Sequence, residues 1–299
     1  MKKCLFIVLS LILVIGSLVT DGLARKVTDP LGRTLTVPES PLRVVALAPS
    51  VTEIVYSLGQ ERRLIGVTEH SDFPPAAKAL YTVGSYVKLD IERIVAIKPD
   101  LCIAIKDGNP KDVVERLMKL HIPVYVVDPQ SLESVLSAIT QIGMLLEAQD
   151  QAQALVSALQ TRIARVSDIV AGTNRRPKVF IQIGLTPIVS VGTHTFIHEL
   201  IERAGGINLA RGEAPYPRFS REQVLGLAPD VIIITSMERS SNFEQARADW
   251  LRWPGLPAAR NQQIFIEDAN LFNRPSPRLV EGLEHLARLI HPDLFKGAP

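Results

Sequence analysis

Aromatic and arginine side chains are concentrated in segments that we expect to be loops, where they could bind a ligand. Flat aromatic faces suit a large conjugated or macrocyclic molecule. Guanidinium groups suit carboxylate, phosphate or amide oxygens. Asn270 and Ser276 add neutral hydrogen-bonding groups. Ordinary loop packing is the alternative for each of these residues. The aromatic and arginine residues are Phe73, Tyr86, Tyr216, Phe219, Phe272, Arg218, Arg274 and Arg278.

Two histidines, His194 and His198, are four residues apart in a segment that we expect to be helical, over 194–204. Such a pair can bind a metal ion, and His70 and Asp72 are the candidates for the remaining ligands. The alternative is a solvated start of the helix, and we adopt it. No metal ligand is therefore predicted, although a metal-ion receptor using His70, His194 and His198 stays open.

Motifs of enzyme catalysis are absent from the sequence. It has no G-x-S-x-G motif, no Walker loop and no G-x-G-x-x-G after a strand. The formal net charge is +2 and no long run of like charge occurs, which gives no indication of a nucleic-acid partner. We therefore predict a binding protein with no catalytic residue and no cofactor. An exported enzyme is the alternative from another class.

The elements that would position these residues are strands alternating with helices, a pattern typical of a parallel α/β fold. The pattern begins at 43 and restarts at 178, and the amphipathic run between them, over 150–171, predicts one long helix. We predict two lobes of 43–148 and 173–299, joined by a helix over 149–172, with the ligand cleft between them. One more helix on a single α/β domain is the alternative. The expected strands are 43–47, 64–67, 101–105, 124–127, 178–183, 231–235 and 262–266.

One local pattern occurs in both halves, as ERIVAIKPDLCI from Glu92 and as EQVLGLAPDVII from Glu222. A short helix must end before each proline, and a strand follows the aspartate. This repeat predicts pseudo-symmetric lobes. The two glutamates give each lobe one exposed carboxylate, a pair suited to arginines on a two-fold symmetric membrane partner. Alternatively, each carboxylate only complements its helix dipole, which contributes about 0.3–1 kcal/mol.

The first residues have the composition of a secretory signal. Lys2 and Lys3 precede an apolar run over 5–19, and Gly22-Leu23-Ala24 has the small-x-small pattern of a cleavage site. We predict a cleaved signal peptide over 1–24, export of the chain, and an irregular or hairpin lead-in over 25–42. An uncleaved membrane anchor is the alternative, but the apolar run is shorter than the roughly 20 residues needed to span a bilayer. Cys102 lies in an apolar strand and is expected to be buried and unpaired.

Several segments together resemble the periplasmic receptors of ABC importers that take up cobalamin, ferric siderophores and haem. The resemblance covers about Arg43 to His291, and it is greatest to the cobalamin-binding members. It implies two Rossmann-like lobes joined by a single long α-helix, ligand capture in the cleft, and delivery to a permease dimer powered by ATPase subunits. The segments are RVVALAPSVTEIVYSLG, SDFPP, LDIERIVAIKPDLCI, FSREQVLGLAPDVIIIT and RPSPR.

The resemblance also implies roles for particular residues. Glu92 and Glu222 match the two glutamates that dock onto permease arginines in this family. Tyr86 stands where a cobalamin receptor has Trp, and it lies one position from the iron-ligating Tyr of haem receptors. A ferric siderophore or haem is therefore the alternative ligand, because Arg218, Arg274 and Arg278 could neutralise an anionic ferric complex. The residues that match ligand contacts are Phe73, Tyr86, Tyr216, Asn270 and Arg274.

Overall fold

The structure is a computed structural model that describes residues 24–235 and 242–295. The predicted signal peptide therefore lies outside the described residues, except for Ala24. Within the described part, no helix combines the length and the apolar character that a membrane crossing requires. The chain after Ala24 begins with an antiparallel hairpin of β1 (Ala24–Thr28) and β2 (Thr34–Pro38), which occupies most of the predicted lead-in.

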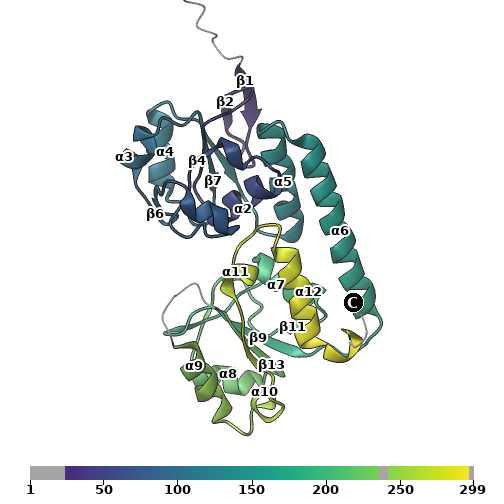
Figure 1. Cartoon of the computed structure of the whole chain (residues 1–299). Coiled ribbons are helices and arrows are strands. Elements are labelled where there is room, and N and C mark those ends of the chain that lie inside the picture. The colour runs from purple at the N-terminus through teal and green to yellow at the C-terminus, as the bar shows by residue number, and fades with distance from the viewer. Residues whose placement is uncertain (1–23, 236–241, 296–299) are drawn as a thin grey trace, which may run out of the picture.

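Two four-stranded parallel sheets form the centres of two lobes, as the α/β pattern predicts (Figure 1). The N-terminal sheet has the order β4-β3-β7-β8 and the C-terminal sheet has the order β11-β9-β13-β14, so corresponding strands have the same neighbours. The N-terminal strands are β3 (Val44–Ala46), β4 (Leu64–Gly66), β7 (Leu101–Ile105) and β8 (Val124–Val127). The C-terminal strands are β9 (Lys178–Gln182), β11 (Ile207–Asn208), β13 (Val231–Ile234) and β14 (Ile264–Ile266).

The repeated Pro-Asp pattern forms the same corner in both lobes. It joins α3 (Ile91–Ala96) to β7 and α8 (Arg221–Leu227) to β13. The residue before each proline is left-handed, with φ of 47° at Lys98 and 49° at Ala228, so neither helix continues into its proline. The Asp100 carboxylate accepts from the amides of Leu42 and Arg43, at the start of β3. The equivalent Asp230 carboxylate accepts from the Lys178 amide, at the start of β9, with an N–O distance of 2.9 Å.

Alternating side chains of each sheet belong to two different cores, because successive strand residues face opposite sides. The outer face of the N-terminal sheet, which includes Cys102, packs on α3 and α4 (Lys111–Lys119). Cys102 is buried and free, as expected, and burial raises the pKa of its thiol. The outer face of the C-terminal sheet packs on α8, α9 (Phe243–Leu251) and α10 (Pro257–Arg260).

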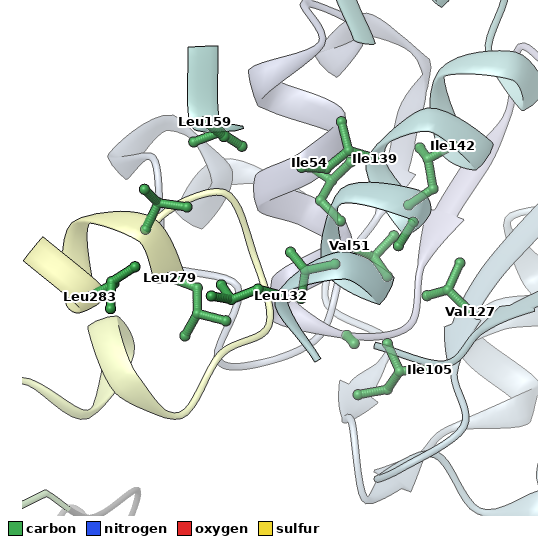
Figure 2. Close-up of a cluster of buried hydrophobic side chains, with 14 of the residues drawn as sticks. Val51, Ile54, Ile105, Val127, Leu132, Ile139, Ile142, Leu159, Leu279 and Leu283 are labelled. Carbon is green, nitrogen blue, oxygen red and sulfur yellow. The ribbon is translucent and has the colours of Figure 1, made fainter. Parts of the chain in front are cut away.

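The inner faces of both sheets share one continuous apolar cluster. It includes side chains of α2 (Pro49–Ser57) and α5 (Leu132–Leu145) from the N-terminal lobe and of α7 (Phe196–Arg203) and α12 (Leu279–Ile290) from the C-terminal lobe. Figure 2 shows the junction, where Leu132 of α5 lies near Leu279 of α12. The cluster is therefore a core between the lobes as well as within them.

The long helix α6 (Gln149–Ala171) packs on α5 and on α12, and in Figure 1 it runs along both lobes. Arg162 of α6 forms a bidentate ion pair with Glu284 of α12, with N–O distances of 2.8 Å. The assignment of α6 as the link between the lobes, with lobe boundaries at 148 and 173, stays a prediction.

Some elements differ from the sequence-based expectation. The helix expected over 194–204 begins at Phe196, because the Thr195 side chain accepts from the His198 amide and caps it. The pattern did not indicate several short elements. They are α9, α10, α11 (Ala269–Phe272), β5 (Gly84–Ser85), β6 (Lys88–Leu89), β10 (Ile188–Val189) and β12 (Arg218–Phe219).

Candidate ligand-binding site

A cavity of about 500 Å³ lies between the two lobes and widens into solvent, with about 1480 Å³ of empty space in all. Its walls come from loops at the carboxyl ends of parallel strands in both sheets. Asp107 and Gly108 follow β7, Gln130 follows β8, and Ile183 follows β9. Ligands of open α/β sheets bind at this edge, outside the carboxyl ends of the strands. The cavity is therefore the candidate binding site.

Tyr86 and Tyr216 contribute the aromatic side chains that were expected at the site, one from each lobe. Gly108 lies against the Tyr86 ring so closely that a β-carbon there would be 2.8 Å from a ring carbon. Tyr216 is about half exposed. Its burial raises the pKa of the phenol, and negative charge on Asp107 and Tyr86 raises it further. The site thus has two phenols near one carboxylate.

Asn109 holds the loop that carries Gly108, and it was not among the residues predicted from the sequence. Its side-chain amide donates to the carbonyl oxygens of Leu47 and Tyr86, both at 2.8 Å, and its side-chain oxygen accepts from the Ile105 amide at 2.8 Å. Asn109 therefore joins the ends of β3 and β7 to the backbone of Tyr86. The polar Lys-Asp-Gly-Asn-Pro sequence directly after a buried strand was the signal that could have indicated it.

We expect Asn109→Ala to lower the free energy of unfolding by about 1–3 kcal/mol, because it leaves three backbone groups without their partner. The measurement is urea denaturation of both proteins. Asn261→Ala, at an exposed position, is the control and should change the stability little. A loss below about 0.5 kcal/mol for Asn109→Ala would contradict this role for the amide.

Arg274 lines the cavity, but its guanidinium also binds carboxylates of the other lobe. It is 3% exposed, and its Nη1 donates to Glu53 at 3.1 Å and to Asp72 at 2.9 Å. Its Nη2 donates to the His70 carbonyl at 2.8 Å. The Glu53 carboxylate, 2% exposed, also accepts from Ser276 at 2.6 Å. These groups connect α2 with the segment between α11 and α12.

Arg278 completes this interlobe network, which we define as Glu53, Asp72, Arg274, Ser276 and Arg278. Its guanidinium donates to both Glu53 oxygens, at 2.9 Å and 2.7 Å. Burial is the largest single effect on the pKa of Arg278 and lowers it, but hydrogen bonding to Glu53 and the charge of nearby carboxylates together outweigh burial, so the pKa is raised. Two arginines thus meet two carboxylates, so the network carries no net charge.

Two other residues expected at the site are not among those that line the cavity. Phe73 packs beneath Arg278, whose guanidinium carbon lies 3.8 Å from the centre of the ring, and it is 40% exposed. Asn270 lies in α11, where its backbone amide donates to the Asp268 side chain at 2.9 Å. The structure therefore brings Tyr86, Tyr216 and Arg274 together at the cavity and places Phe73 and Asn270 outside its lining.

Glu92 and Glu222 occupy the first turns of α3 and α8, and both are exposed. The two helices are capped by the side chains of Asp90 and Ser220. Hydrogen bonds from its own backbone amide and from Ser220 lower the pKa of Glu222. Neither glutamate lines the cavity, so both are available to a partner.

The expected histidine pair does not lie on one helix, since His194 precedes the cap of α7. His198 Nδ1 lies 3.1 Å from the side-chain amide of Asn208, while His194 lines the cavity. In the described part of the chain, no three His, Cys, Asp or Glu side chains are grouped so that they could hold a metal ion.

Two parallel-sheet lobes with a cavity between their carboxyl edges are the architecture of a two-lobed solute-binding protein. A family model described as periplasmic binding protein matches residues 44–271, and the chain belongs to this family.

Comparison with individual proteins gives the same class. The vitamin B12-binding protein of Yersinia pestis is 30% identical over 256 residues, which cover 85% of this chain and 88% of that protein. The periplasmic vitamin B12-binding protein BtuF of Vibrio cholerae matches with a TM-score of 0.76 and 30% identity, over 85% of this chain and 98% of that one. A periplasmic haem-binding protein of Pseudomonas aeruginosa has the same TM-score and identity, over 85% and 94%.

Proposed function

We propose that the protein captures cobalamin or a related corrinoid in the interlobe cavity and delivers it to an ABC importer. The charge of the cavity is the observation that favours a corrinoid over an anionic ferric complex. Among the described residues that line it, Arg274 is the one arginine or lysine, and Glu53 and Asp72 already neutralise it. A ligand whose side groups are neutral amides needs no free cation there, whereas an anionic ferric complex would.

The two tyrosines would supply the main contact surface. Their rings can pack on a macrocycle, and their hydroxyl groups can hydrogen-bond to amide side groups. Gln130 and Asn273, which also line the cavity, add neutral donors and acceptors. In this proposal Phe73, which packs on Arg278, and Asn270 of α11 act indirectly, since neither lines the cavity.

Tyr86→Ala should weaken ligand binding by about 1–2 kcal/mol, because it removes an aromatic contact. Calorimetric titration of both proteins with cyanocobalamin measures the change. Tyr81→Ala is the control, since Tyr81 is an exposed tyrosine of the same lobe that does not line the cavity. An unchanged dissociation constant for Tyr86→Ala would place Tyr86 outside the binding site.

The experiment that tests the ligand is calorimetry with cyanocobalamin, haem and a ferric siderophore mixture in parallel. One-to-one binding of cyanocobalamin at micromolar affinity or better supports the proposal. Heat with an iron complex and none with cobalamin would mean that the ligand is the iron complex, while the protein would remain a solute-binding protein.

Haem is the second candidate, because the phenols of Tyr86 and Tyr216 are oxygen donors suited to ferric iron and both line the cavity. The carboxylates of haem would then need cationic partners other than Arg274, which Glu53 and Asp72 already neutralise. An absorption change of haem on binding that Tyr86→Phe or Tyr216→Phe removes would favour this candidate over cobalamin.

Export and delivery complete the proposal. The signal peptide over 1–24 would direct the chain to the periplasm and be cleaved there. Glu92 and Glu222 would bind arginines of a two-fold permease dimer. Its ATPase subunits would then drive uptake.

A further inference from the structure

His194 differs from the other histidines of the C-terminal lobe. His198 contacts Asn208, the His285 ring lies 2.7 Å from Glu267, and the His291 ring lies 3.2 Å from the Gly205 carbonyl. His194 is exposed, lines the interlobe cavity, and has no hydrogen-bond partner for its ring among residues 24–235 and 242–295. An imidazole with a free ring nitrogen is the commonest metal ligand in proteins.

The backbone on both sides of His194 is held firmly. The Thr193 side chain accepts from the Gly212 amide at 3.0 Å, and the Thr193 amide donates to the Gly212 carbonyl at 3.2 Å. Thr195 is buried, and its hydroxyl donates to the Gly192 carbonyl at 2.9 Å while it caps α7. His194 is therefore presented from a fixed loop, which reduces the entropy lost when it binds a ligand.

A single histidine cannot hold a free metal ion, and the described residues offer no cluster that would complete such a site. A metal chelate is different, because its macrocycle supplies the equatorial ligands and leaves an axial position for one donor from the protein. We propose that His194 binds the metal of the bound chelate as an axial ligand. This inference rests on the proposed function, which puts a cobalt corrinoid in the cavity.

The step is a ligand exchange on cobalt. A neutral imidazole nitrogen of His194 donates its lone pair and forms a Co–N bond, and the Co–O bond to the axial water breaks so that one water leaves. The oxidation state and the total charge of the complex do not change. Aquocobalamin carries such an exchangeable water, whereas the axial cyanide of cyanocobalamin does not exchange in this way. His194 would therefore make the protein selective among corrinoids.

Absorption spectroscopy and calorimetry with the two corrinoids test the inference. Aquocobalamin should change its absorption spectrum on binding, cyanocobalamin should not, and aquocobalamin should bind about tenfold or more tightly. In His194→Ala the spectral change should be lost, and the ratio of the two affinities should fall toward one.

His121→Asn is the control, since His121 is exposed, lies outside the cavity and has a left-handed φ of 61° that asparagine tolerates. Binding of both corrinoids by the wild-type protein at equal affinity, with no spectral change, would overturn the role of His194 and keep the proposed function. A spectral change that persists in His194→Ala would assign the axial ligand to another side chain. No binding of either corrinoid would instead overturn the proposed function, and with it this inference.

Discussion

Glu53→Ala should lower the free energy of unfolding by about 3–5 kcal/mol, the loss typical of removing one partner from a buried ion pair. The carboxylate is 2% exposed and accepts from Arg274, Ser276 and Arg278 of the other lobe. Without it, the 3% exposed Arg274 keeps Asp72 as its one charged partner among the residues that the structure describes. Chemical denaturation of the wild-type and variant proteins gives the difference.

Two further variants make this result interpretable. Ser276→Ala removes one charged hydrogen bond of 2.6 Å and should cost about 1.5–3 kcal/mol, so it reports on the network even where Glu53→Ala does not fold. Glu147→Ala breaks an exposed ion pair with Arg63, of 3.5 Å, and should cost less than about 1 kcal/mol. A Glu53→Ala loss no larger than that of Glu147→Ala would show that the network contributes little.

The double variant Glu92→Ala/Glu222→Ala should abolish uptake while the dissociation constant for the ligand stays unchanged. Both carboxylates are exposed at the first turns of the repeated helices and lie outside the cavity lining. In the proposed function they are the contacts with the importer, so their loss should separate delivery from capture. Uptake of labelled cyanocobalamin by cells in which this protein is the only receptor measures delivery, and calorimetry measures capture.

A matched control distinguishes docking from helix stabilisation. Glu133 and Glu244 are also exposed first-turn carboxylates, one in each lobe, at the starts of α5 and α9. The variant Glu133→Ala/Glu244→Ala should keep uptake near the wild-type level. Equal loss of uptake in both double variants would mean that Glu92 and Glu222 only complement their helix dipoles and do not dock onto the importer. A large loss of ligand affinity in the first variant would place them at the binding site instead.

The regular elements could be predicted because their signals are local. The strands at 101–105 and 124–127 have the predicted bounds, and α8 ends before its proline as predicted, since apolar runs and proline breaks mark these elements. Two-residue strands such as β10 and β12 are too short for any period to indicate them. The late start of α7 could have been found, because threonine is a preferred capping residue and Thr195 directly precedes the helix.

The site was harder to predict, because it depends on contacts between distant parts of the chain. Arg274 and Glu53 are 221 positions apart, so no local pattern pairs them. Loop composition drew attention to Tyr86 and Tyr216, which line the cavity, but it could not separate them from Phe73, which packs on an arginine. Glu53 did carry a signal of its own, as a single charge in the apolar helix PSVTEIVYS.

The apolar cluster shared by the inner faces of the two sheets makes each lobe a poor candidate for an independent module. A fragment containing only the N-terminal sheet would expose the face of α5 that packs on α6 and α7 in the whole chain, together with other side chains of the shared cluster (Figure 2). Large apolar patches of this kind promote aggregation of isolated fragments. Engineering that exchanges one lobe between relatives must therefore keep α6 together with its contacts in α5 and α12, and new ligand specificities are more safely built into the cavity loops alone.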